Sequence, residues 1–354
     1  MNFYTKYRPK GFKDIVGQEN IVVTLQKSLK NNSFGHAYFF YGPKGTGKTS
    51  LARIFAKELQ QNENVLKGQC SDVIEIDAAS NRGIDNIKDI IEKANWPPRD
   101  NPYKIYIIDE CHQLTPEANN ALLKILEEPP SYLKFILCTT EKKKTKSFET
   151  ILSRCIRFTF QKLKTKDIAE RLRKISDSEK INVTDCALLE LAIMSDGALR
   201  DAIVKLEQIA SLKLNKEINK EFVLKYFHIS DRKFIYEIVN DIINNDLVSL
   251  LTKLDLLLLS NVDIVYILQE VSKVFRNILI IKIVKNDLIE KKLINLSQND
   301  VELLKGLSVN VNDAKKLSKL PSQFADAEKA LEININNRWV LETTLINCAM
   351  FLAD

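Results

Sequence analysis

The sequence predicts an α/β domain, in which helices flank a parallel sheet, followed by a small helical domain and an all-helical C-terminal domain. Two observations predict this order. Eight of the ten glycines lie at or before Gly83 and eight of the nine prolines lie at or before Pro130, so the front of the chain holds most of the turns. In that front part, short apolar runs alternate with helical patterns, which is typical of a parallel sheet buried on both faces.

The expected strands are continuous apolar runs, and they span Ala37–Tyr41, Val73–Ile76, Lys104–Ile108, Phe135–Cys138 and Cys155–Phe160. The helical patterns between them span Gln18–Lys30, Thr49–Gln60, Ile84–Ala94 and Pro116–Glu128. The last of these helices has clear signals at both ends. Thr115 suits the N-cap position before Pro116, and Pro129 cannot continue the helix.

A change of composition near Gln161–Lys166 marks the end of the α/β domain, so the expected domains are 1–162, 163–229 and 230–354. Amphipathic helical patterns recur in the last domain, at Phe234–Asn244, Val262–Val284 and Arg338–Leu352. Helices with wide apolar faces need partners, and we therefore expect this domain to mediate oligomerisation.

The composition is ordinary for a globular protein, with 45% hydrophobic and 28% charged residues. The net charge of +6 is only mildly basic, so it is compatible with nucleic-acid binding but does not demand it. The six cysteines form no CxxC pair, which suits a reducing cytosol. We see no apolar signal-peptide core near the N-terminus and no apolar run long enough to cross a bilayer, and we expect a cytoplasmic protein that does not bind membranes.

The run from Phe40 to Thr49 is the most informative stretch of the chain. A glycine-rich loop follows an expected strand and opens an expected helix, so backbone N–H groups and the positive helix end can surround an anion. Lys48 would reach the β- and γ-phosphates of a nucleoside triphosphate, and the Thr49 hydroxyl would hold Mg²⁺. The alternative is a chance turn. The loop residues expected to bind the nucleotide are Gly42, Pro43, Lys44, Gly45, Thr46, Gly47, Lys48, Thr49 and Ser50.

Asp109 and Glu110 follow the expected strand Lys104–Ile108 at its C-terminal end, which is where ligands bind in open α/β sheets. Asp109 would coordinate Mg²⁺, directly or through water, and Glu110 would orient and activate the attacking water. The alternative is a solvated loop that carries two carboxylates.

Further motifs follow one another along the chain: Tyr7-Arg8-Pro9, Val16-Gly17-Gln18-Glu19, the segment Glu75 to Gly83, Asp109-Glu110-Cys111-His112, the segment Ala121 to Pro130, and Ser153-Arg154-Cys155. In this order they resemble the AAA+ clamp-loader ATPases, and in particular the gamma/tau subunits of bacterial DNA polymerase III. The resemblance is dense over residues 4–211 and thinner behind them. It implies a P-loop AAA+ domain, a helical lid domain and an all-α collar domain for the three parts of the chain.

The resemblance also implies a role for each matching residue. Thr140 would be the sensor 1 residue, and Arg200 would be sensor 2, reaching the γ-phosphate from the lid. Arg154 would be an arginine finger that acts on ATP held by a neighbouring subunit. The residues that would frame the adenine and ribose are Tyr7, Arg8, Pro9, Val16 and Gly17.

Two of these arginine assignments have alternatives nearby. Arg157 lies three residues after Arg154, but it lacks the flanking Ser153 and Cys155. Arg200 could instead form a structural ion pair with Asp196 or Asp201.

DNA contacts are expected from Ser80, Asn81 and Arg82, which precede a helix, and from Lys124, whose family position faces the central chamber. Such contacts would follow the duplex backbone without reading its sequence. An ordinary solvated surface is the alternative for these residues.

The chain departs from the family pattern in two places. The stretch Leu59 to Asp72 retains only Cys70 of the family's four zinc-binding cysteines, so zinc is not expected. The loop Glu141 to Thr150 is longer than the family pattern and lacks its Asp-Pro start, which bears on the geometry around Thr140.

Taken whole, the resemblance implies an ATP- and Mg²⁺-dependent motor subunit of the bacterial replicative clamp loader, within the DNA polymerase III holoenzyme. Its implied partners are delta and delta-prime type subunits, further copies of itself, the sliding clamp (beta) and primer-template DNA. No second carboxylate set for nucleotidyl transfer is present, so no polymerase active site is expected in this chain. The alternatives are a non-hydrolysing structural clamp-loader subunit and another AAA+ DNA-remodelling ATPase.

Overall fold

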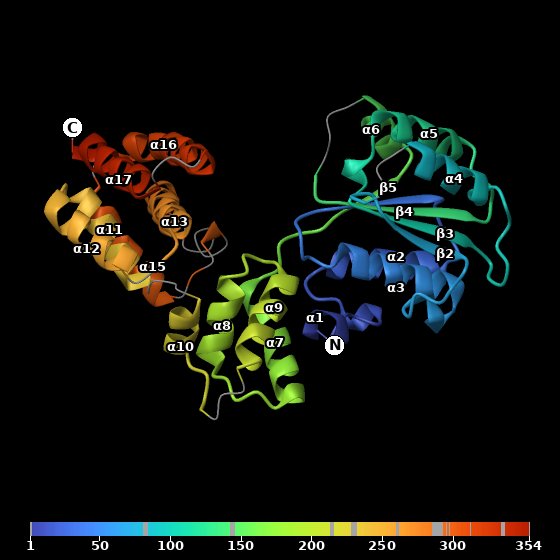
Figure 1. The fold of residues 1–354 in the computed structure, drawn as a ribbon, viewed down its shortest axis with the longest axis horizontal. Coiled ribbons are helices and arrows are strands. Elements are labelled where there is room, and N and C mark those ends of the chain that lie inside the picture. Colours follow the sequence, from blue (N-terminus) through green and yellow to red (C-terminus); the bar gives the residue numbers. More distant parts are fainter. Residues whose placement is uncertain are drawn as a thin grey trace. The chain divides into compact units, whose positions relative to one another are not determined.

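The computed structural model describes residues 2–80, 84–141, 146–212, 216–227, 232–259, 262–284, 293–294, 296, 298–311, 313–333 and 337–353. The chain divides into two compact units, Met1–Asn219 and Lys220–Asp354 (Figure 1). The expected boundary after residue 162 falls inside the first unit, and the one at residues 229 and 230 lies outside the described residues. The three-domain division therefore stays a prediction.

In the first unit, the described residues form a five-stranded parallel sheet with the strand order β2-β3-β4-β1-β5. All five expected strands are confirmed, with small shifts at their ends. Parallel pairing aligns Tyr41 with Thr139 and Asp77 with Asp109, so these strand ends meet at one edge of the sheet. The strands are β1 Ala37–Tyr41, β2 Val73–Asp77, β3 Lys104–Asp109, β4 Leu133–Thr139 and β5 Ile156–Thr159.

Helices cover both faces of this sheet (Figure 1). Successive residues of β1 point to opposite faces, as the strand period of two requires. Phe39 therefore packs in the cluster beneath α4, α5 and α6, whereas Phe40 packs in the cluster with α2 and α3. The helices are α2 Glu19–Lys30, α3 Lys48–Gln60, α4 Ile84–Ala94, α5 Pro116–Glu127 and α6 Lys146–Ser153.

The predicted start of α5 is confirmed, because the Thr115 hydroxyl accepts a hydrogen bond from the Ala118 N–H at 3.2 Å. The helix ends at Glu127, one residue before the predicted end. Short 3-10 helices occur at η1 Phe12–Asp14, η2 Glu63–Val65 and η3 Cys111–Gln113.

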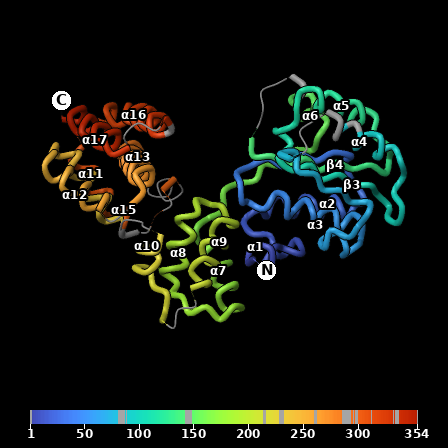
Figure 2. The backbone as a smooth tube through the Cα atoms, in the orientation of Figure 1, coloured from blue at the N-terminus to red at the C-terminus, as the bar shows by residue number. Residues whose placement is uncertain are grey.

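The first unit ends in a group of helices onto which the N-terminal segment packs (Figure 2). The Phe3 N–H donates to Glu207 Oε2 at 3.0 Å, and the Tyr7 hydroxyl donates to Glu179 Oε1 at 2.5 Å. These contacts hold α1 against the helical group. The helices are α1 Phe3–Lys6, α7 Thr165–Glu179, α8 Asp185–Ile193 and α9 Leu199–Ala210.

All the secondary-structure elements described in the second unit are helices. Ile238, Val271 and Leu345 are fully buried in its apolar core. Helices α11, α13 and α17 confirm the three expected amphipathic segments. No helix within the described ranges is both long and apolar enough to cross a membrane. The helices are α10 Lys220–Tyr226, α11 Arg232–Ile243, α12 Leu247–Leu259, α13 Ile264–Ile283, α15 Gln298–Val309, α16 Ala314–Glu332 and α17 Asn337–Ala353.

Candidate functional site

A cleft beside the C-terminal ends of β1 and β3 brings together most of the predicted nucleotide-site residues from the N-terminal segment, the glycine-rich loop, the end of β3 and α9. The predicted residues that line it are Tyr7, Arg8, Pro9, Val16, Lys44, Gly45, Thr46, Gly47, Lys48, Thr49, Ser50, Asp109, Glu110 and Arg200. Sequence reasoning missed six lining residues, namely Tyr4, Ile15, Leu163, Arg171, Leu199 and Ile203. No local pattern marks them, because most come from elements that only folding brings to the loop.

The glycine-rich loop needs glycine for two separate reasons. Gly45 and Gly47 adopt left-handed backbone angles, with φ of +75° and +99°. A Cβ on Gly42 would lie 2.5 Å from the Phe160 carbonyl oxygen, so the residue that follows β5 leaves no room for a side chain there. The loop is also tied to α9, because the Leu199 N–H donates to the Gly45 carbonyl at 3.1 Å.

Lys48 is buried at the base of this loop, with only 5% of its surface exposed. Its ammonium donates to the carbonyl oxygens of Gly42 at 2.8 Å and Pro43 at 2.9 Å. Burial lowers the pKa of Lys48, and the nearby Glu110 carboxylate works in the opposite direction. A phosphate in the cleft would supply the negative charge that a buried cation favours. Gly42 and Pro43 do not line the cleft but hold this lysine.

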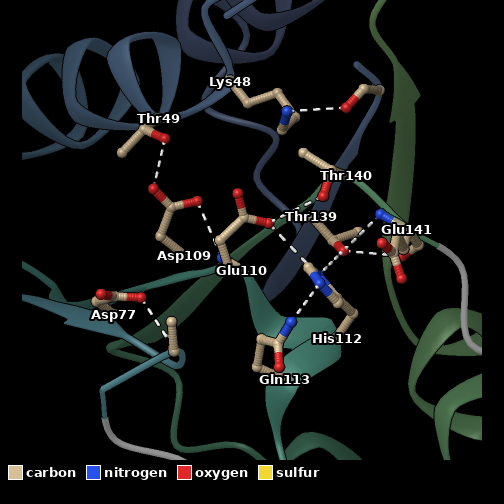
Figure 3. Close-up of polar contacts among 12 residues, drawn as sticks. Lys48, Thr49, Asp77, Asp109, Glu110, His112, Gln113, Thr139, Thr140 and Glu141 are labelled. Carbon is tan, nitrogen blue, oxygen red and sulfur yellow. Dashed lines mark hydrogen bonds and ion pairs between the residues drawn. The ribbon is translucent and has the colours of Figure 1, made fainter. Parts of the chain in front are cut away.

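Thr49 and Asp109 present neighbouring oxygens, as a hard divalent cation prefers. The Thr49 hydroxyl donates to Asp109 Oδ2 at 2.7 Å, and the Glu110 N–H donates to Asp109 Oδ1 at 3.0 Å (Figure 3). Burial raises the pKa of Asp109, whereas these two hydrogen bonds lower it. A cation bound here would favour the ionised carboxylate, so both residues fit the predicted Mg²⁺ site.

Glu110 occupies an unusual backbone conformation for a non-glycine residue, with φ of +47°. The Thr140 hydroxyl donates to Glu110 Oε2 at 3.2 Å, so the predicted sensor 1 residue contacts the predicted water-activating residue (Figure 3). Thr140 does not itself line the cleft. His112 also lies near this carboxylate, although sequence analysis assigned it no role; its place in the Asp-Glu-Cys-His motif was the available signal.

Arg200 lies in the wall of the cleft, where its guanidinium carbon is 4.8 Å from the centroid of the Tyr4 ring. Asp196, one of the two carboxylates considered as an ion-pair partner, pairs with Lys162 at 2.5 Å. The helix that carries Arg200 follows Gly197, which has φ of +83°. Arg200 and the N-terminal segment therefore meet at the same wall of the cleft.

The charge around the cleft is positive. Burial lowers the pKa of Arg8, and the nearby cations Arg53 and Arg200 lower it further. Arg53 is compensated by Glu75, to which it donates two hydrogen bonds of 2.6 Å. An electropositive cleft of this kind attracts polyphosphates.

Arg154 does not line the cleft of its own chain. Its guanidinium contacts Glu127 Oε1 at 2.6 Å and donates to the Thr150 carbonyl at 3.0 Å. Arg157, the nearby alternative, donates to the Leu152 carbonyl at 2.8 Å. Both arginines therefore lie at the end of the sheet that carries β5, and Arg154 is held against the C-terminal turn of α5.

The remaining predicted site residues that the structure describes lie outside the cleft. Ser80 is exposed and its hydroxyl donates to Asp77 Oδ2 at 3.1 Å, and Lys124 is exposed on α5. Gly17, also outside the cleft lining, has a left-handed φ of +69°. Asn81, Arg82 and residues 142–145 of the longer loop lie outside the described residues. Cys70 is buried, with its sulfur 3.5 Å from Asn101 Nδ2.

The chain is similar to known replication proteins. Residues 17–164 match the family described as DNA polymerase III, delta subunit. The DNA polymerase III subunit tau of Bacillus subtilis is 47% identical over 222 residues, which cover 59% of this chain but only 39% of that protein. The DNA polymerase III subunit gamma of Buchnera aphidicola subsp. Baizongia pistaciae is 33% identical over 331 residues, which cover 88% of each chain.

Among solved structures, the RuvB Holliday junction branch migration motor of Thermotoga maritima superposes with a TM-score of 0.50 at 22% identity, covering 67% of this chain and 79% of that chain. A likeness at this identity concerns the fold alone. It confirms the predicted arrangement, in which helices flank a parallel sheet and a helical group follows.

Proposed function

Because the chain belongs to the gamma/tau family of DNA polymerase III subunits, we propose that it is an ATP-driven motor subunit of a replicative clamp loader. The reaction would be the hydrolysis of ATP to ADP and phosphate, with Mg²⁺ as the metal. The observation that carries the proposal is the cleft in which the glycine-rich loop, Asp109 and Glu110 converge.

Each part of the cleft has a task in this reaction. The loop N–H groups and Lys48 would hold the phosphates, and Thr49 with Asp109 would hold Mg²⁺. Glu110 would take a proton from the attacking water as that water adds to the γ-phosphorus. The residues that would hold the base and sugar are those of the N-terminal segment, Tyr7, Arg8, Pro9, Val16 and Gly17.

Catalysis would need a second subunit. Arg154 lies outside its own cleft, so it would stabilise the transferring phosphoryl group in a neighbouring subunit. Arg200 would sense the γ-phosphate within its own chain and couple the angle of the lid to the nucleotide state.

The proposed assembly contains delta and delta-prime type subunits and further copies of this chain. It would open the sliding clamp and load it on primer-template DNA in the cytoplasm. Residues 230–354 would form the oligomerising collar, and Ser80, Asn81, Arg82 and Lys124 would contact the DNA backbone. Within the DNA polymerase III holoenzyme, polymerisation itself would belong to another chain.

A non-hydrolysing structural clamp-loader subunit is the main alternative. The paired Thr49 and Asp109 oxygens favour the hydrolysing form, because a structural subunit needs no metal site. A DNA-remodelling ATPase of the RuvB kind shares the fold, so the fold does not decide between the two.

Nucleotide binding and turnover in two variants test the proposal. Glu110→Gln should keep ATP binding and lose turnover by about 10²–10⁴-fold, because the water-activating carboxylate is gone. Lys48→Ala should lose ATP binding as well. A wild-type chain that binds ATP but does not hydrolyse it, even with its partner subunits and DNA, would support the structural alternative.

A further inference from the structure

Glu110 needs groups other than its own helix to orient its carboxylate. It precedes the 3-10 helix η3 with a left-handed backbone, so the helix geometry does not set its side-chain direction. Two residues approach the same carboxylate oxygen. The Thr140 hydroxyl lies 3.2 Å from Oε2, and His112 Nδ1 lies 3.4 Å from it (Figure 3).

His112 is part of a buried hydrogen-bond network. Its side chain is 5% exposed, and Thr139, with which it interacts, is fully buried. His112 Nδ1 lies 2.9 Å from Thr139 Oγ1, and His112 Nε2 lies 2.9 Å from Gln113 Nε2 (Figure 3). Both ring nitrogens therefore have a partner, and both partners constrain where the proton lies.

The partners place the proton of His112 on Nδ1. The Gln113 amide nitrogen can only donate, so His112 Nε2 accepts. The Thr139 hydroxyl donates to the Glu141 carbonyl at 2.8 Å, which leaves its oxygen to accept from His112 and from the Glu141 N–H at 3.1 Å. The His112 Nδ1–H therefore points toward Thr139 Oγ1, with Glu110 Oε2 as its second acceptor.

We infer that His112 is a positioning residue for Glu110. Together with Thr140 it fixes Oε2, and Oε1 stays outside this network to face the attacking water. Thr139 ends β4 and Thr140 follows it, while His112 belongs to η3 after β3. The network therefore also ties the carboxylate to both neighbouring strand ends. This inference rests on the proposed ATPase function and adds a residue to it.

A matched pair of substitutions tests the inference. An Asn side-chain amide reaches about as far as the imidazole Nδ1, whereas a Gln amide reaches about as far as Nε2. His112→Asn should therefore keep most of kcat in the assembled loader, and His112→Gln and His112→Ala should lower it by about 10–100-fold. ATP affinity should change by less than about 2-fold in all three, because His112 does not line the cleft.

A merely structural role for His112 would give different results. It would lower the thermal unfolding midpoint and ATP binding together, and Asn and Gln would not differ in kcat. In a Glu110→Gln background, positioning predicts no further loss from His112→Gln, whereas a structural role predicts that the losses multiply. If His112→Ala does not fold, the Asn and Gln pair and this double variant decide.

Different results would refute the proposed function and the positioning role of His112. No turnover by the wild-type assembly would overturn the proposed function. Turnover that Glu110→Gln abolishes, but that His112→Gln leaves at the wild-type level, would overturn only the positioning role.

Discussion

Gly45 links the nucleotide loop to the helix that carries Arg200, and replacing it with alanine tests that link. The Leu199 N–H donates to the Gly45 carbonyl, and a Cβ on residue 45 would lie 2.9 Å from the Cβ of Ala198. The left-handed backbone alone costs alanine about 1–2 kcal/mol. Forcing a methyl group into a packed contact adds about 1–3 kcal/mol. We expect Gly45→Ala to lower the free energy of unfolding by about 2–5 kcal/mol.

Gly47 is the matched control for this substitution. It also has a left-handed backbone, with φ of +99°, but an added Cβ would meet nothing within 4 Å. Gly47→Ala should therefore lose only about 1–2 kcal/mol. The double variant Gly45→Ala with Ala198→Gly should recover the steric part of the loss, because the clash with the Ala198 side chain is removed. Urea unfolding of the nucleotide-free chain measures all four proteins. Equal losses at positions 45 and 47, or no recovery with Ala198→Gly, would refute the reasoning.

Three further predictions concern the site and the sheet. Thr49→Val should weaken Mg²⁺-ATP binding by at least about 10-fold, because it removes both the proposed metal ligand and the donor to Asp109. Thr49→Ser should bind like the wild type in a calorimetric titration. Tyr4→Ala should weaken ATP binding by about 2–5-fold, because the ring beneath Arg200 is lost. Tyr4→Phe keeps the ring and should bind ATP like the wild type. A loss of affinity in both variants would contradict a role for this contact. Burial disfavours the ionised form of Asp72, but hydrogen bonds from a side-chain amide and backbone N–H groups outweigh it and hold its pKa below 3.8. The ionised form therefore stabilises the fold above about pH 4, and this effect is lost as pH falls through the lowered pKa. The difference in free energy of unfolding between the wild type and Asp72→Asn should therefore shrink from pH 7 to pH 3. A difference that does not change with pH would count against this assignment.

The sheet and its flanking helices could be predicted because their signals are local. The apolar runs in the buried strands and the end signals of α5 each lie within a few residues of sequence. Helix α12 was not predicted, although its buried residues Leu250, Leu254 and Leu257 keep a helical spacing. Nine of its thirteen residues are apolar, and some of these, such as Val248, lie on the exposed side and blur the pattern. Helix α16 was not predicted either, and it holds Pro321 in its interior, where proline usually ends a helix.

The candidate site could be predicted as far as its residues belong to motifs. The glycine-rich loop is one continuous stretch of sequence, and so is the acidic pair. The two were predicted to converge, and residues of both line the cleft. The contacts of Tyr4 with Arg200 and of Arg154 with Glu127 join residues far apart in the chain, so no spacing rule indicates them. His112 belongs to the Asp-Glu-Cys-His motif, but only the packing of η3 against β4 shows which atoms it contacts.

The most direct test of the central claim is steady-state ATP hydrolysis by the chain assembled with delta-type partners and the sliding clamp, with and without primed DNA. We predict that primed DNA raises the turnover. Arg154→Ala should remove this rise and lower turnover by up to about 10³–10⁵-fold, while ATP binding survives. Arg157→Ala is the matched control and should keep the rise, because Arg157 lies outside the Ser-Arg-Cys motif that marks the proposed finger. Turnover that does not respond to DNA, or that Arg154→Ala leaves unchanged, would contradict a clamp-loader motor with a finger acting between subunits.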